Sequence, residues 1–208
     1  MKRVAVDGVK VVGEWRLSPP AGSVPPTELR LGHFDLALLD GQFQYLLFFD
    51  FPGSTQELRD GHFPRLRRSL SLALSLFYPI AGRAVQSPES LNYPGGDHVI
   101  RCSDGDSASL ALAESGADLT SLVGNQATKQ QQGTTPLIAI QVTVFPGSGV
   151  SVWFVFNHIA ADGFGFIHFL KSWAAINSKA AAVDVSVVKD LPVVDRAVLG
   201  DLERPHLS

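Results

Sequence analysis

The spacing of apolar residues along the chain separates short predicted strands from two predicted helices. Runs rich in β-branched and aromatic residues, bounded by Gly, Pro, Ser or Asp, are typical of strands. Such runs occupy residues 9–17, 44–51, 82–86, 98–102, 107–113, 137–145 and 150–156. The last two are separated by a turn-forming segment, 146–149, and therefore predict a hairpin.

Two of these strands are expected to be buried. Residues 44–51 are mostly aromatic or aliphatic and stop at Pro52-Gly53, which is typical of a buried strand. Residues 150–156 carry apolar side chains on both faces. We therefore expect 150–156 to be a central strand that is covered on both sides.

At two places along the chain the apolar residues follow the spacing of a helix instead of forming a strand-like run. Pro64 suits the first turn of one helix and Pro79 its end. Its apolar residues at helical spacing are Leu66, Leu70, Ala73, Leu74 and Phe77. A second helix is expected from near Gly163 to Asn177, with Phe166, Ile167, Leu170, Trp173 and Ala174 at helical spacing. Interleaved strands and helices predict an α/β or α+β fold in two layers.

Composition limits the classes of function. The 208 residues suit one large domain or two small ones, and the formal net charge is -3. The chain lacks a basic excess, which argues against nucleic acid and anionic lipid as partners. Its longest apolar runs are far shorter than the roughly 20 residues that span a bilayer. Asp7 and Gly8 interrupt any signal-peptide core, so we expect a cytoplasmic protein.

Two polar features have alternative interpretations. Arg65, Arg67 and Arg68 near the start of the first helix are either anion ligands or a solvated face, and the solvated face is favoured. The segment 104–106, Asp-Gly-Asp, is interpreted as a tight hairpin turn, because the spaced ligands and closing Glu of a calcium loop are missing. The glutamine-rich residues 124–133 predict an exposed loop.

The segment with the clearest chemistry is 157–163, Asn-His-Ile-Ala-Ala-Asp-Gly, between the predicted central strand and the second helix. His158 follows the carboxyl end of the strand, where an imidazole can take a proton from a hydroxyl. Asp162 lies four residues later, and by spacing alone a core histidine with a capping Asp explains the pair better. Only His168 lies nearby as a second metal ligand, and Cys102 is the only cysteine, so no metal is expected.

The context of this segment resembles the plant BAHD acyl-CoA-dependent acyltransferases. Residues 156–163, followed by Phe169-Leu170-Lys171-Ser172-Trp173-Ala174, resemble the His-x-x-x-Asp-Gly region of that family. Further similar stretches follow the family order and cover nearly the whole chain: 18–20 with 24–26, 34–36, 70–72, 77–83, 137–143 and 191–196. The branch most resembled transfers malonyl or hydroxycinnamoyl groups to anthocyanins and other phenolic glucosides.

The resemblance implies a chloramphenicol-acetyltransferase-like fold, with a mixed sheet, flanking helices and the histidine at a channel between two domains. His158 is then the general base, which deprotonates the acceptor hydroxyl as it attacks an acyl-CoA thioester. Acyl-CoA is a co-substrate, and no cofactor or metal is permanently bound. Asp162 is implied to be structural, and Gly163 is expected to allow the close turn into the helix.

The chain also departs from the family pattern. Family members continue into a second domain with an Asp-Phe-Gly-Trp-Gly motif and most coenzyme A contacts, so the cofactor-binding residues are unknown here. Residues 1–208 are expected to be a single amino-terminal domain, with 191–208 as the start of a crossover segment and the carboxyl-terminal domain absent. A full-length protein is expected to be a monomer, and the half to self-associate through exposed apolar surface.

Two alternatives to an active enzyme of this family remain. One is a catalytically inactive truncated remnant or binding module of the same family, because a half site loses substrate positioning. The other is a peptide-synthetase condensation domain, which shares the fold but usually has two adjacent histidines, where this chain has Asn157 and His158.

Overall fold

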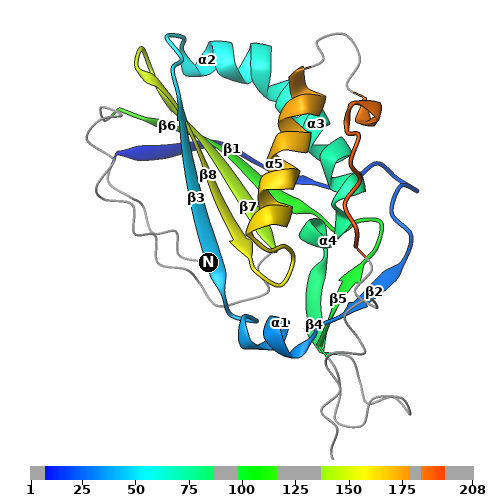
Figure 1. Ribbon diagram of the computed structural model, residues 1–208. Coiled ribbons are helices and arrows are strands. Elements are labelled where there is room, and N and C mark those ends of the chain that lie inside the picture. The colour runs from blue at the N-terminus through cyan, green and yellow to red at the C-terminus, as the bar shows by residue number, and fades with distance from the viewer. Residues whose placement is uncertain (1–7, 87–97, 117–136, 179–183, 195–208) are drawn as a thin grey trace, which may run out of the picture.

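The computed structural model describes residues 8–86, 98–116, 137–178 and 184–194 (Figure 1). Its largest element is a five-stranded sheet with the strand order β1-β6-β7-β8-β3. The strands are β1 (Val9–Leu17), β6 (Ala108–Ser115), β7 (Ile138–Phe145), β8 (Gly149–Asn157) and β3 (Gln42–Phe49). Among these five described strands only β6 and β7 are parallel neighbours, so the sheet is mixed. The predicted β7–β8 hairpin is confirmed. The predicted loop at 124–133 lies outside the described residues.

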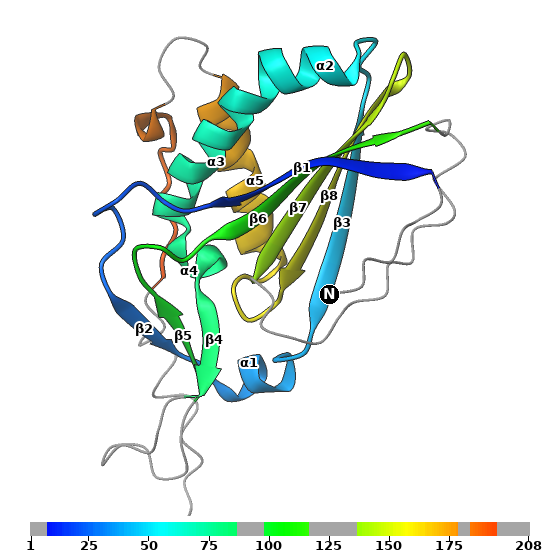
Figure 2. The same cartoon turned by 180° about the vertical axis from the view of Figure 1, so that it is seen from behind.

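Two long helices, α3 (Phe63–Leu76) and α5 (Gly163–Ser178), lie together on one face of this sheet (Figures 1 and 2). Both predicted helices are therefore confirmed. Pro64 occupies the first turn of α3, as its missing amide hydrogen allows. The predicted stripe of α3 is buried at Leu70, Ala73 and Leu74. Together the sheet and helices form the two expected layers.

The arginines at the start of α3 do not act alike. The guanidinium of Arg67 lies 5.0 Å from the centre of the Trp15 ring on β1, a cation–π geometry. Arg65 is half-buried and Arg68 is exposed. The solvated-face interpretation therefore describes Arg68 but not Arg67, whose charge is placed over an aromatic face.

A separate three-stranded sheet has the order β2-β5-β4. Its strands are β2 (Thr27–Arg30), β5 (His98–Cys102) and β4 (Arg83–Gln86), with the short helix α4 (Tyr78–Ala81) next to β5. The hairpin prediction for 104–106 is wrong, because this turn joins β5 to β6 in the other sheet. The backbone N–H of Asp106 donates to the Ser103 carbonyl at 3.1 Å, a hydrogen bond typical of a tight turn. The turn itself is therefore present, but it connects two sheets.

Four short helical elements complete the described chain. The helix α1 (His33–Ala37) precedes β3, and α2 (Thr55–Glu57) runs into the π-helix Leu58–His62 before α3. A 3-10 turn, Val185–Val187, follows α5. No helix in the described part of the chain is long and apolar enough to cross a membrane.

The expected burial of the strand at 44–51 is wrong. This strand is β3, and it lies at the edge of the sheet with Phe43, Tyr45, Phe48 and Phe49 exposed. β8 is an interior strand as expected, between β7 and β3, but it is not fully covered on both faces. Phe154 and Phe156 of β8 are buried beneath α5, but Trp153 on the opposite face is only half-buried. An apolar run has the same local pattern at an edge as in the centre of a sheet, which explains why the burial of β3 was predicted wrongly.

Candidate functional site

The loop from β8 into α5 places His158 directly after the last residue of β8. The backbone N–H of His158 donates to the Gly41 carbonyl at 3.0 Å, which ties the loop to the start of β3. The imidazole ring lies 4.8 Å from the Phe43 ring, centre to centre, with a tilt of 51°. His158 is thus held at the end of the sheet by one hydrogen bond and one ring contact.

Asn157 organises this loop from the preceding position. Its side-chain amide donates to the Leu39 carbonyl at 2.7 Å. Its side-chain oxygen accepts from the backbone N–H of Ile159 at 3.0 Å. Sequence reasoning noted Asn157 only as the residue in place of a second histidine. The structure shows that it connects the histidine loop to the chain before β3.

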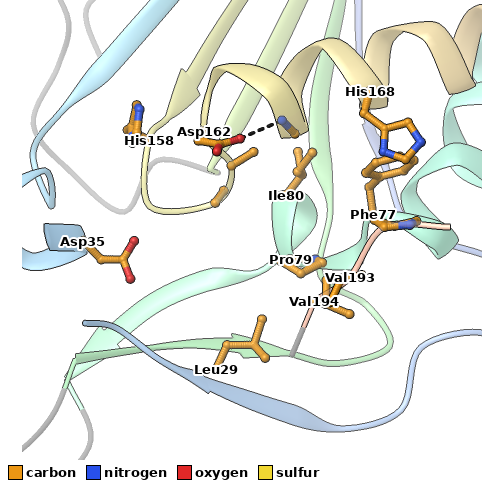
Figure 3. Close-up of a pocket in the computed structure, with 14 residues that line it drawn as sticks. Leu29, Asp35, Phe77, Pro79, Ile80, His158, Asp162, His168, Val193 and Val194 are labelled. Carbon is orange, nitrogen blue, oxygen red and sulfur yellow. Dashed lines mark hydrogen bonds between the residues drawn. The ribbon is translucent and has the colours of Figure 1, made fainter. Parts of the chain in front are cut away.

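A cavity of about 400 Å³ lies beside His158 (Figure 3). Most of its wall is apolar, and it is formed by five parts of the chain: β2, α1, the α3–α4 region, the β8–α5 loop with the first turns of α5, and residues 192–194. The lining residues are Leu29, Asp35, Phe77, Pro79, Ile80, His158, Ala160, Ala161, Asp162, Gly165, His168, Pro192, Val193 and Val194. The structure therefore places the predicted base in the wall of a partly open, mainly apolar cavity.

Asp162 is positioned by the first turn of α5. Its carboxylate Oδ1 accepts a hydrogen bond from the Gly165 N–H at 2.7 Å (dashed line in Figure 3). Its backbone carbonyl accepts from Phe166 N–H at 2.9 Å. A carboxylate at this position caps free amide groups and interacts favourably with the helix dipole. The contacts of Asp162 are those of a helix cap.

Gly163 does not have the steric role expected of it. A Cβ atom at this position would meet no atom within 4 Å. Its φ angle is also not positive, unlike those of Gly22, Gly105 and Gly147. The turn into α5 is therefore open to a residue with a side chain as far as local sterics are concerned.

Two polar residues of the cavity were missed by sequence reasoning. Asp35 of α1 accepts a hydrogen bond from Gly32 N–H at 3.0 Å and lies on the same side of the cavity as His158. His168 of α5 lies on the other side, with its ring edge against Phe77 at 5.1 Å (Figure 3). His168 was considered only as a metal ligand. Asp35 stands in the family-like stretch 34–36, but no spacing in the sequence links either residue to His158, because distant parts of the chain bring them together.

Next to the cavity, burial raises the pKa of Tyr78 in α4, and the nearby Cys102 adds to the increase. Its hydroxyl is therefore neutral at physiological pH. Within the described residues, no group of three or more His, Cys, Asp or Glu side chains could hold a metal ion.

Comparisons with known proteins place this site in a family. A profile of the Transferase family matches residues 15–196. The coumaroyl-CoA:anthocyanidin 3-O-glucoside-6''-O-coumaroyltransferase 1 of Arabidopsis thaliana is 30% identical over 86% of this chain and 41% of its own length. The phenolic glucoside malonyltransferase 1 of Nicotiana tabacum is 29% identical over 92% of this chain and 45% of its own length.

A solved structure supports the same fold. The crystal structure of vinorine synthase matches with a TM-score of 0.66 at 20% identity, covering 92% of this chain and 46% of that one. At this identity the match shows the fold alone, and it confirms the fold class expected from the resemblance. The chain belongs to the Transferase family, the BAHD acyltransferases. It spans less than half the length of the curated relatives named above.

Proposed function

We propose that this chain provides the base-bearing part of an acyl-CoA-dependent acyltransferase. The acceptor is the hydroxyl of a phenolic glucoside, and the donor is a malonyl or hydroxycinnamoyl thioester. The relatives support this class, because they are named as a coumaroyltransferase that uses coumaroyl-CoA on an anthocyanidin glucoside and as a phenolic glucoside malonyltransferase. The observation that carries the proposal is His158 in the wall of a mainly apolar cavity at the end of β8.

In the proposed reaction His158 is the general base. A neutral imidazole nitrogen takes the proton of the acceptor hydroxyl as its oxygen attacks the thioester carbonyl carbon. The C–S bond then breaks, and the imidazolium returns the proton to the coenzyme A thiolate. The products are an ester and free coenzyme A. No covalent acyl-enzyme is formed.

The surroundings of His158 suit such a role. The hydrogen bond from its backbone to Gly41 and the contact with Phe43 restrict the imidazole, and positioning of a base determines much of its effect on rate. The apolar part of the cavity, at Leu29, Phe77 and Ile80, suits an aromatic ring. Asp162 acts on this reaction indirectly in the proposal, by capping the helix that follows the loop.

The test is acyl transfer by the chain in two forms. The 208-residue chain is assayed alone and together with the separately made carboxyl-terminal half of the Arabidopsis coumaroyltransferase. Coumaroyl-CoA or malonyl-CoA is the donor, an anthocyanidin 3-O-glucoside is the acceptor, and released thiol and acylated product are measured. We expect turnover in the combined form. There His158→Ala should lower kcat by roughly 10²- to 10⁴-fold, the contribution of a positioned base.

A matched control is His62→Ala, which removes an exposed imidazole that packs on Phe51 away from the cavity. It should leave kcat nearly unchanged. Near-normal turnover of the His158 variant would contradict the role of base. If neither form transfers an acyl group but the chain binds the glucoside, it is a binding module of the family.

A further inference from the structure

The cavity beside His158 contains a second imidazole that the proposed reaction does not use. His168 lies in the second turn of α5, across the cavity from His158 (Figure 3). Its ring is half-buried and meets the Phe77 ring edge-on, with 5.1 Å between the ring centres. Among the described residues, no hydrogen bond reaches a ring nitrogen of His168. The contact with Phe77 therefore restricts the imidazole and leaves its nitrogens open to a bound molecule.

The wall around His168 is apolar. Phe77 lies directly beside the imidazole, and Val193, from the segment that follows the 3-10 turn, lies on the same side of the cavity (Figure 3). Small-molecule sites are mostly apolar, with a few polar groups that fix the orientation of the ligand. At this end of the cavity His168 is a polar group of that kind, and the walls suit a flat apolar ring.

The charges of the lining disfavour an anionic substrate group. Asp35 and Asp162 line the cavity on the side of His158, and none of its described lining residues is Lys or Arg. The carboxylate of a malonyl thioester is one methylene away from the carbonyl that must approach His158. It would therefore come close to like charges, which repel it. A hydroxycinnamoyl group carries no such charge.

We propose that His168 is a specificity-determining residue, whose imidazole forms a hydrogen bond with the hydroxyl of a phenol ring bound in this cavity. A neutral imidazole has one N–H donor and one acceptor nitrogen, and a phenol hydroxyl can donate or accept. The ring itself packs on Phe77 and Val193. This inference rests on the proposed function and deepens it, because it favours the hydroxycinnamoyl donor over the malonyl donor.

The shape of a hydroxycinnamoyl group matches the two ends of the cavity. Its reacting carbonyl and its ring hydroxyl stand at opposite ends of one flat, conjugated unit. With the carbonyl at His158, the hydroxyl is directed toward His168 on the far side. A phenolic glucoside acceptor offers the same phenol chemistry, but there a sugar ring separates the reacting hydroxyl from the phenol ring. The test therefore has one arm for each source.

The test is binding of small neutral probes to the 208-residue chain, measured by titration calorimetry. The donor arm compares methyl p-coumarate with methyl cinnamate, which lacks the ring hydroxyl. The acceptor arm compares hydroquinone glucoside with phenyl glucoside, which differ in the same way. We expect the chain to bind methyl p-coumarate about 3- to 10-fold more tightly than methyl cinnamate, the net effect of one hydrogen bond. A preference in the acceptor arm alone would assign the phenol to the acceptor.

Variants of His168 show whether the imidazole causes this preference. His168→Phe retains a ring against Phe77 but no hydrogen-bonding group, so the two members of the pair should bind equally well. His168→Gln retains a donor and an acceptor and should keep part of the preference. His62→Phe is the matched control, because His62 is exposed and packs on Phe51 away from the cavity, and it should keep the whole preference. Circular dichroism checks that each variant is folded.

Three results would overturn the proposal. The first is equal binding, or no binding, of both members in both arms. The second is a preference that survives in folded His168→Phe. The third comes from monomethyl malonate, which should bind more weakly than methyl p-coumarate. If it binds as tightly and His168→Phe weakens it, the imidazole holds a carboxylate instead. These measurements need no turnover, so their outcome is independent of the acyl-transfer assay.

Discussion

The buried face of α5 and its amino-terminal end are built differently. On the buried face, the Phe166 ring stacks on Phe156 of β8 at 4.0 Å, and Trp173 reaches across to α3. At the amino-terminal end, Asp162 and Phe164 are exposed and the chain is held by hydrogen bonds of the first turn. Side-chain packing thus fixes where the helix lies. Its amino-terminal end places polar groups beside the cavity and buries few apolar side chains. Substitutions on the buried face should therefore change the stability of the fold, and substitutions at the terminus should change the proposed reaction.

The largest effect on stability is expected at Phe166, which is fully buried between β8 and Phe169. Phe166→Ala should lower the free energy of unfolding by about 3–5 kcal/mol, because it removes buried apolar surface and leaves a cavity. Denaturant unfolding measures this change. Phe164→Ala is the matched control in the same helix, since Phe164 is 90% exposed, and it should change stability by less than about 0.5 kcal/mol. An equal loss of unfolding free energy in the two variants would contradict the difference between the buried face of α5 and its amino-terminal end.

The next largest effect is expected at Ser69 of α3, whose hydroxyl lies between the two helices. It accepts from Trp173 Nε1 at 2.9 Å and donates to the Leu66 carbonyl at 3.0 Å. Ser69→Ala leaves the buried indole N–H without its acceptor and should cost about 1–3 kcal/mol.

Ser75→Ala in the same helix is the control for this substitution. Ser75 also donates to the carbonyl three residues earlier, at 2.7 Å from Leu72. It is half-buried and should cost less than about 0.5 kcal/mol. Both values come from denaturant unfolding, and a Ser69 variant as stable as the Ser75 variant would show that the indole finds another acceptor.

A smaller effect is expected at Asp162. Asp162→Ala removes the acceptor for Gly165 N–H and should lower stability by about 0.5–2 kcal/mol. Asp162→Asn retains a side-chain oxygen and should lose less. If Asp162 is structural, the pH profile of kcat/KM in the combined form of the enzyme should keep its shape in both variants. A shifted profile with an unchanged melting temperature would instead make Asp162 a direct partner of His158.

The smallest effect on stability is expected at His158, although its removal should have the largest effect on turnover. The fold holds this residue through its backbone N–H, which His158→Ala retains. Loss of the ring contact with Phe43 should change the free energy of unfolding by about 0.5 kcal/mol or less. Thermal and denaturant unfolding of the variant provide the measurement. A large loss of stability would mean that the imidazole is mainly a packing residue.

Local patterns were sufficient to predict much of this molecule. The helical stripe ending at Phe77 and the proline at its first turn predicted α3, and α5 was predicted in the same way. The placement of His158 directly after a strand was also predictable, because strand, loop and helix follow one another in sequence. Asp35 and His168 were not predictable as neighbours of His158. They reach the cavity from α1 and from the second turn of α5, and no spacing rule connects these positions.

The sequence by itself determined the helices, the β7–β8 hairpin, the strand-end histidine and the family, because each depends on residues that are close along the chain or on a motif order. Only the tertiary structure decided that β3 lies at the edge of the described sheet, that β2, β5 and β4 form a separate sheet, and that five separate segments line one cavity. The burial of a strand depends on which other strands pair with it, and those partners are distant in sequence. Phe43 and Phe154 have the same intrinsic preference for a strand, but among the described strands β8 has neighbours on both sides and β3 has one.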